Sequence, residues 1–208
     1  MELWRIGLIG TGDIVFEEGF PYELQNKVHK VLGKMSLKTC NNISCGVSKD
    51  CTNEEYFLID GSTVSFSYRV HFIDDEKIYN ELEDEERFIY SCIFSRSCDG
   101  YVRQTHLRKI LVDGFPQWCM PYILKLSSEY VVEIIDDIYE YMETRDNTLF
   151  QVFCENNSHM FRYSYSRMVS YWNEYYRYNC YKLHDYVGYR LYKQCFGYSC
   201  KNKRNWLL

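Results

Sequence analysis

Several patterns that mark common classes of protein are missing from this chain. No apolar run approaches the roughly 20 residues that a membrane-spanning helix needs. The apolar start, Met1 to Gly10, has neither a basic leader nor a small-residue cleavage pattern. The G-x-S-x-G elbow of serine hydrolases and the phosphate-binding loop are also absent. We therefore expect a cytoplasmic protein that does not associate with a membrane.

The sequence also lacks the close histidine and cysteine spacings that are typical of metal sites. The five histidines form no H-x-x-x-H pair and the ten cysteines form no C-x-x-C pair. Without a secretion signal the cysteines are expected to be reduced thiols. A site built from Cys40, Cys45, Cys195 and Cys200 stays an alternative, because ligands need only meet in space, and so does a Cys–His pair. The prediction is that the protein holds no metal and no cofactor.

Composition and charge describe an ordinary globular chain with an uneven distribution of charge. Its 208 residues are 46% apolar and 25% charged, enough for one large or two small domains. The net charge of −5 excludes a generally basic nucleic-acid binder. There are eleven acids and two bases between Glu54 and Glu86, whereas there are nine bases and three acids from Glu155 onward. The two regions either form an interaction patch or face each other within the fold.

The first third of the chain combines a helix signal with a hairpin signal. Pro21 to Met35 is predicted helical, because apolar residues recur at helical spacing after a first-turn proline. Ser36 to Asn53 is polar and is predicted to be a loop. Tyr56 to Ile59 and Thr63 to Ile73 are predicted strands, joined by an Asp-Gly turn that favours a β-hairpin.

The pattern then becomes helical. Asp74 to Ile93 is predicted as one helix whose early acids complement its positive end. Asp99 is placed to cap the next helix, which Gly114 to Pro116 ends. Ser128 is predicted to cap a strongly amphipathic helix that runs to Met142.

The remainder is rich in tyrosine and also helical. Residues 156–159 are predicted to connect helices, and 164–196 to form one or two more, with Gly188 as a weak point. The fold class is therefore α+β, with a small N-terminal antiparallel sheet and a larger, mostly helical C-terminal part. The expected organisation is an α+β subdomain of residues 1–95 and a helical subdomain of residues 96–208, packed as one unit.

The first residues resemble the opening of Rossmann dinucleotide-binding dehydrogenases. A predicted strand, Leu3 to Ile9, leads into Gly10-Thr-Gly12. Val15 stands where the third glycine of that motif belongs, and Glu17-Glu18 would repel a phosphate. A structural strand and turn is therefore the expectation, without a nucleotide.

A second resemblance, over Cys98 to Met142, is to HEAT-type helical repeats. Tyr101-Val102-Arg103 and Tyr130-Val131-Val132-Glu133 each open a helix, 29 residues apart, with Pro121 to Leu126 between them. HEAT repeats stack antiparallel helix pairs. This resemblance implies a scaffold for protein or nucleic-acid contacts.

One polar cluster could carry chemistry. Arg96, Asp99, Arg103 and His106 surround one helix start, and the last three share a face at offsets of four and three. They form either an anion or acid–base site, which would suit an enzyme, or a helix cap with an ion pair. We favour the structural interpretation and keep the four as candidate binding residues.

Eleven of the 38 residues from Phe161 to Tyr198 are tyrosines, interspersed with bases. A buried tyrosine needs a partner for its hydroxyl, so part of this set is expected at a surface. Trp172, Tyr175, Tyr176 and Arg177 are the candidate binding residues here, because these residue types dominate interface energetics. The hypothesis is a non-enzymatic adaptor, inhibitor or immunity-like protein with a protein partner. The alternatives are single-stranded nucleic-acid binding and a tyrosine-lined core.

Overall fold

The computed structural model describes residues 16–40, 43–45, 54–112 and 114–199, so the predicted N-terminal strand and glycine turn lie outside the described residues. The fold is α+β, as the sequence predicts. The chain divides into two compact units, Met1–Cys119 and Met120–Leu208. The sequence placed a boundary near residue 95 instead, but helices on either side of that residue pack together in the first unit. No helix in the described ranges is long and apolar enough to cross a membrane.

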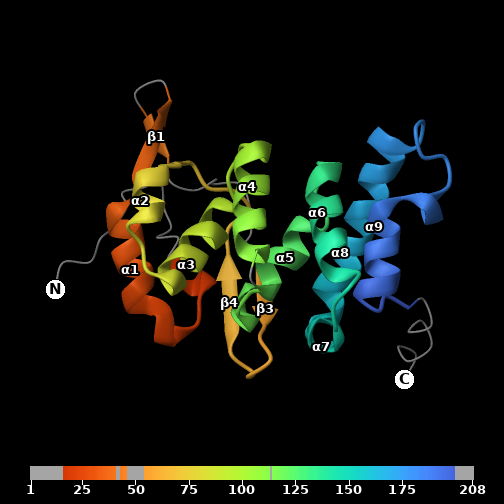
Figure 1. The fold of residues 1–208 in the computed structure, drawn as a ribbon, viewed down its shortest axis with the longest axis horizontal. Helices are drawn as coiled ribbons and strands as arrows, with labels where there is room; N and C mark the ends of the chain where they lie inside the picture. Colours follow the sequence, from red (N-terminus) through yellow and green to blue (C-terminus); the bar gives the residue numbers. More distant parts are fainter. Residues whose placement is uncertain (1–15, 41–42, 46–53, 113, 200–208) are drawn as a thin grey trace. The chain divides into compact units, whose positions relative to one another are not determined.

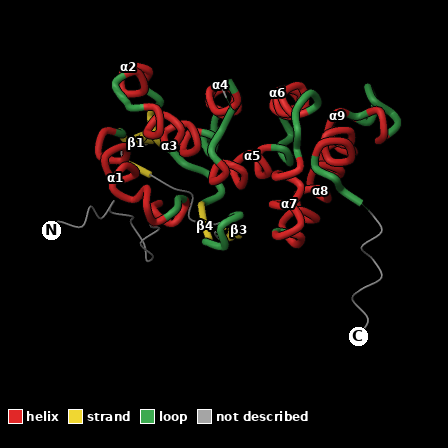
Figure 2. Tube along the Cα trace, turned by 60° about the horizontal axis from the view of Figure 1, so that its bottom comes forward, coloured by secondary structure: helices red, strands yellow, loops and turns green. Residues whose placement is uncertain are grey.

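The described residues of the first unit include four α-helices: α1 (Gln25–Lys34), α2 (Glu76–Asn80), α3 (Asp84–Phe94) and α4 (Gly100–Leu111). Figures 1 and 2 show α3 between α1 and α4, and it packs against both. Buried aliphatic and aromatic residues of α3 and α4 make up much of this core. The single helix predicted over 74–93 is wrong, because the chain breaks after α2. α3 then begins as a separate helix, and the side chain of Glu86 accepts a hydrogen bond from the backbone N–H of Glu83 at its start.

Five short strands lie among the described residues of this unit. β3 (Glu54–Phe57) and β4 (Thr63–Phe66) form the predicted antiparallel hairpin, and Gly61 adopts a φ of 87° in its turn. β1 (Ser36–Cys40) lies between β2 (Ile43–Cys45) and β5 (Phe72–Ile73) in a second antiparallel sheet.

Two predictions for these strands are therefore wrong. Ser36 to Asn53 contains strands where a loop was expected, and the strand expected over 63–73 is interrupted after Phe66. The interruption has a physical cause. The backbone N–H of Val70 donates to the carbonyl of Arg96, so this stretch pairs with the turn after α3 instead of extending β4.

The described residues of the second unit include five α-helices: α5 (Met120–Leu126), α6 (Val132–Met142), α7 (Thr148–Asn156), α8 (Ser158–Tyr171) and α9 (Val187–Arg190). α9 packs against α6 and α8 (Figure 1). α8 continues as a π-helical turn, Trp172–Tyr176, and α9 as a second one, Leu191–Cys195. The buried stripe of α6, which includes Ile134, Ile138 and Met142, is the stripe that the sequence predicts.

Three local predictions for this unit are corrected. Ser128 donates to the carbonyl of Lys125 and lies four residues before α6, so it does not cap that helix. The connection predicted at 156–159 is a single residue, Asn157, because α7 ends at Asn156 and α8 begins at Ser158. Gly188 is not a weak point: an added Cβ there would lie 2.7 Å from Tyr186 Cε1 and 2.8 Å from Met168 Cγ, so glycine permits close packing.

The resemblance to HEAT repeats stays a prediction. Its first helix, α4, belongs to the first unit, and its later helices, α5 and α6, belong to the second. The contacts within each unit therefore do not test whether these helices stack as repeats.

Candidate functional site

The polar cluster chosen from the sequence lies around the turn between α3 and α4. Arg96 and Arg103 are fully buried, and both guanidinium groups bind this turn or the chain beside it. Arg96 Nη2 donates to the carbonyl of Tyr68 at 2.6 Å, and Arg103 Nη1 donates to the carbonyls of Ser97 at 2.9 Å and Cys98 at 3.2 Å. Backbone carbonyls that lack partners in secondary structure are thus satisfied by arginine. Both arginines hold the α3–α4 turn.

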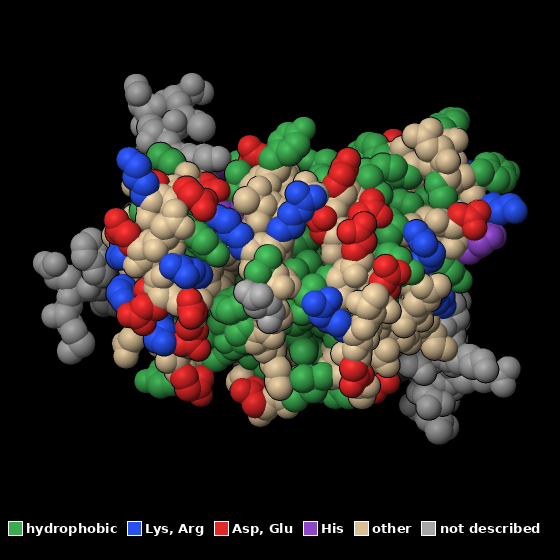
Figure 3. Space-filling model, viewed as in Figure 1, with side chains coloured by type: hydrophobic (Ala, Val, Ile, Leu, Met, Phe, Trp, Pro, Cys, Tyr) green, Lys and Arg blue, Asp and Glu red, His purple; other side chains and the backbone are tan. Residues whose placement is uncertain are grey.

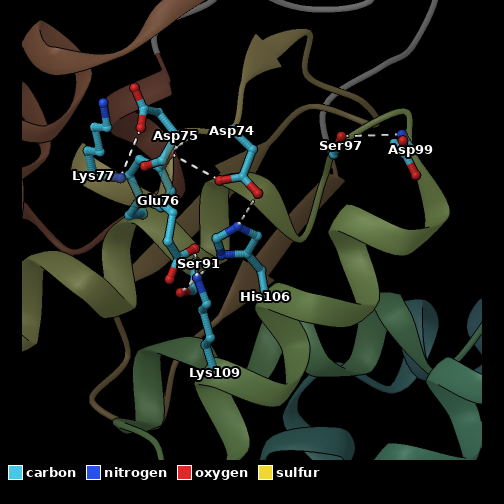
Figure 4. Close-up of polar contacts among 10 residues, drawn as sticks. Asp74, Asp75, Glu76, Lys77, Ser91, Ser97, Asp99, His106 and Lys109 are labelled. Carbon is cyan, nitrogen blue, oxygen red and sulfur yellow. Dashed lines mark hydrogen bonds and ion pairs between the residues drawn. The ribbon is translucent and has the colours of Figure 1, made fainter. Parts of the chain in front are cut away.

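Asp99 does what the sequence predicts for helix capping. It is exposed, and its Oδ1 accepts a hydrogen bond of 2.9 Å from the backbone N–H of Tyr101 in the first turn of α4. Figure 4 shows Asp99 beside Ser97, away from the imidazole of His106. The structure therefore brings Arg96 and Arg103 together at the turn and leaves His106 in a separate network.

His106 is fully buried between two polar side chains from other segments (Figure 4). Its Nε2 lies 3.0 Å from Asp74 Oδ2, and its Nδ1 lies 3.3 Å from Ser91 Oγ. Its ring lies 5.1 Å from the ring of Phe94 and 5.5 Å from that of Tyr90. The network joins α4 and α3 to the segment that precedes α2.

Asp74 is the ionisable end of this network. Burial alone would raise the pKa of its carboxyl, but the hydrogen bond and the charge of His106 outweigh burial and hold the pKa below its usual value. Tyr90 contributes a further hydrogen bond of 3.2 Å to Asp74 Oδ1, and burial raises the pKa of its hydroxyl. The carboxylate is therefore the stable form at neutral pH.

An Asp–His–Ser series is also the arrangement with which many hydrolases activate a serine. Here Ser91 is 1% exposed and His106 is 0% exposed, so a substrate has no access to the hydroxyl. A nucleophile must reach the substrate to react. The arrangement supports folding of the first unit and not catalysis. Asp74 and Ser91 were missed as its members, because they are distant in sequence and no motif links them.

In the second unit, two of the chosen residues fix the backbone. Trp172 Nε1 donates to the carbonyl of Cys180 at 2.9 Å, which holds the segment after the π-helical turn. The hydroxyl of Tyr176 donates to the carbonyl of Tyr130 and accepts from the backbone N–H of Val132 at 3.2 Å. Tyr176 thus takes the capping role at the start of α6 that was predicted for Ser128.

The other two chosen residues, Tyr175 and Arg177, are exposed. The Tyr175 side chain is 57% exposed, and its ring touches those of Tyr130 and Tyr171 at centroid distances of 6.2 and 6.1 Å. Tyr178 and Tyr181 follow, 96% and 74% exposed. We refer to these five tyrosines, Tyr130, Tyr171, Tyr175, Tyr178 and Tyr181, as the tyrosine surface.

Other tyrosines of the same segment do form core. Tyr186 and Tyr192 are buried, and the hydroxyl of Tyr192 lies 2.8 Å from Ser127 Oγ. Burial raises the pKa of both phenols. The tyrosine-rich segment therefore serves both purposes that the sequence left open, core and surface, at different positions.

The acidic stretch of the first unit has partners close to it. Glu85 pairs with Lys27, Glu86 with Lys30, and Glu76 with Lys109, all within that unit. These pairs explain most simply why the stretch is acidic. The described residues hold no group of three or more potential metal ligands. In the alternative zinc site, only Cys195 has a described side chain, and it is buried.

Asp136, on α6 in the second unit, has a raised pKa. Partial burial, then repulsion from Glu140 and Glu133, raise the pKa of Asp136, and Arg190 opposes them. A carboxyl whose folded-state pKa is raised favours folding less as the pH rises through the interval between its unfolded and folded pKa values.

Asp136→Asn should therefore stabilise the protein at pH 7, by about 0.5–1 kcal/mol, because like charges one turn apart cost up to about 0.5 kcal/mol each. Thermal unfolding of the variant and the wild type at pH 7 and near pH 3.5 tests this. The gain should shrink at the lower pH, where the carboxyl is largely protonated. An equal gain at both pH values would show that charge is not its cause.

Comparison with protein-family models, with curated proteins and with solved structures found no match to this chain.

Proposed function

We propose that this protein is a non-enzymatic interaction protein whose tyrosine surface binds a partner protein. The observation that carries the proposal is the exposure of Tyr175, Tyr178 and Tyr181 within one short segment. Large aromatic rings left exposed close together in the chain are typical of binding surfaces, and tyrosine is enriched where interfaces gain most of their energy.

The backbone beneath these rings supports the same proposal. Tyr175 belongs to the π-helical turn Trp172–Tyr176, in which the N–H of Arg177 donates to the carbonyl of Trp172 at 2.9 Å. π-Helical turns are rare and occur frequently at functional sites. The hydrogen bonds of Trp172 and Tyr176 hold this turn in place, so the exposed rings start from a fixed backbone. Such preorganisation reduces the entropy lost on binding.

Single-stranded nucleic acid is the weaker alternative because of the acids of α6, although Arg167 and Arg177 lie 5.7 and 5.9 Å from the ring centres of Tyr171 and Tyr181. α6, whose start contacts Tyr176, carries Glu133, Asp136, Asp137 and Glu140 and neither lysine nor arginine. A nucleic-acid site pairs aromatic rings with bases that neutralise phosphate. These acids would repel it.

The test is affinity capture from cells that express the protein naturally, with a Tyr175→Ala/Tyr178→Ala variant beside the wild type. The matched control is Tyr22→Ala/Tyr101→Ala, which removes two tyrosines that are 80% and 85% exposed in the first unit. We expect the control to retain the partner and the first variant to bind it at least about tenfold more weakly, since an interface tyrosine contributes upward of about 1 kcal/mol.

Equal capture by all three proteins would contradict the proposal. Capture that disappears after nuclease treatment would favour the nucleic-acid alternative. Trp172 and Tyr176 are unsuitable for this test, because their replacement removes hydrogen bonds that fix the backbone and would mix stability with binding.

A further inference from the structure

The exposed face of α6 carries only one sign of charge. Glu133, Asp136, Asp137 and Glu140 follow one another at helical offsets of three, one and three residues, so they share a face. The opposite face holds the buried stripe that packs into the second unit. Figure 3 shows Asp and Glu side chains gathered over α6. The helix therefore presents a continuous acidic face to solvent.

These charges differ from the acids of the first unit in one respect. Glu76, Glu85 and Glu86 each have a lysine within 2.7 Å. Within the described part of the chain, neither Glu133 nor Glu140 makes an ion pair. After burial, their repulsion of Asp136 is the next cause of its raised pKa, and Arg190 opposes it only in part. A positive charge supplied from outside would relieve this repulsion.

The acidic face begins beside the tyrosine surface. Tyr130 lies three residues before Glu133, and its ring contacts those of Tyr171 and Tyr175. The Tyr176 hydroxyl binds both the carbonyl of Tyr130 and the N–H of Val132, which fixes the rings against the first turn of α6. Carboxylates next to exposed aromatic faces recognise ammonium and guanidinium ions, through ion pairs and cation–π contacts. Tyr130 and Tyr175 provide such faces beside α6, whereas the rings of Tyr171 and Tyr181 already lie 5.7 and 5.9 Å from Arg167 and Arg177.

We propose that the tyrosine surface and the acidic face of α6 together bind a lysine- or arginine-rich segment of the partner protein. This inference rests on the proposed function and adds the chemistry of the partner. Seven residues of helix separate Glu133 from Glu140, which is about 10 Å at 1.5 Å per residue. About three residues of extended chain cover that length, so a short basic segment suffices.

A direct test uses a fluorescein-labelled peptide of five Arg-Gly repeats as the probe, with matched Glu-Gly and Gln-Gly peptides. Fluorescence anisotropy measures binding to the wild type and to Glu133→Gln/Glu140→Gln, which removes two charges without changing side-chain size. The matched control is Glu18→Gln/Glu55→Gln, which removes two exposed acids from the first unit. We expect the arginine peptide alone to bind, and the α6 variant to bind it about five- to tenfold more weakly than the control does.

Equal binding of the arginine peptide by both charge variants would overturn the inference, because the attraction would then reflect net charge alone. Preference for a single-stranded oligonucleotide over the arginine peptide would overturn it too. The natural partner separates this inference from the proposed function. Tyr175→Ala/Tyr178→Ala could lose the partner while Glu133→Gln/Glu140→Gln keeps it at full affinity. The proposed interface would then be supported, and the inference that the partner binds through a basic segment would be wrong. If neither variant loses it, both fail.

Discussion

His106→Ala should destabilise the first unit by about 3–5 kcal/mol, the range for removing a large buried side chain that leaves a cavity. The imidazole is fully buried and touches the rings of Tyr90 and Phe94. Its removal also leaves Asp74 and Ser91 without the hydrogen bonds that they make to it. Urea unfolding followed by far-UV circular dichroism measures the loss. Hydrogen exchange of α3 and α4 locates it.

Ser91→Ala is the control, because it removes one hydrogen bond from the same network and should cost about 1 kcal/mol.

The loss of stability caused by His106→Ala should also depend on pH. The stabilising ionised form of Asp74 is present above the unfolded-state pKa of aspartate and is lost as the pH falls through its lower folded pKa. The wild type and His106→Ala should therefore differ less in their free energy of unfolding at acidic pH than at pH 7. A loss below about 1 kcal/mol at pH 7 would show that the network contributes little.

Tyr192→Ala should have a comparable effect on the second unit, about 3–5 kcal/mol. The ring is fully buried, lies 5.6 Å from Phe161 in a stacked arrangement, and meets Phe196 edge to face at 5.3 Å. Its hydroxyl is satisfied by Ser127. Urea unfolding again gives the free energy.

Two further substitutions separate the contributions at this position. Tyr192→Phe removes only the hydroxyl and should cost about 1 kcal/mol. Tyr189→Ala removes a half-exposed ring from the same helix and should cost clearly less than Tyr192→Ala. If Tyr189→Ala and Tyr192→Ala were equally destabilising, the division of the segment into core and surface tyrosines would be wrong.

Local signals in the sequence were sufficient for elements that depend on neighbouring residues. The cap at Asp99, the Asp60-Gly61 hairpin and the apolar stripe of α6 follow from turn chemistry and periodicity, and the structure contains all three. β1 and the break after Phe66 were missed. Both depend on contacts between distant segments, namely the pairing of β1 with β5 and of Val70 with the turn after α3. Periodicity carries no information about such contacts.

For the candidate site residues too, the sequence indicated which residues to consider, but their partners depend on contacts between distant segments. The sequence grouped Arg96, Arg103 and His106 around one helix start, but only the structure shows that buried backbone carbonyls and Asp74 are their partners. The sequence named both Tyr175 and Tyr176 as candidate binding residues. Which of the two points to solvent depends on the π-helical turn and on the unsatisfied start of α6, and neither has a sequence signature.

The most direct test of the proposed function is hydrogen–deuterium exchange of the full chain with and without its captured partner. A protein bound at the tyrosine surface should slow exchange in residues 171–181 and in the first turn of α6. The first unit should exchange at the same rate with and without the partner. Unchanged exchange in 171–181, together with protection confined to the first unit, would contradict the proposed interface.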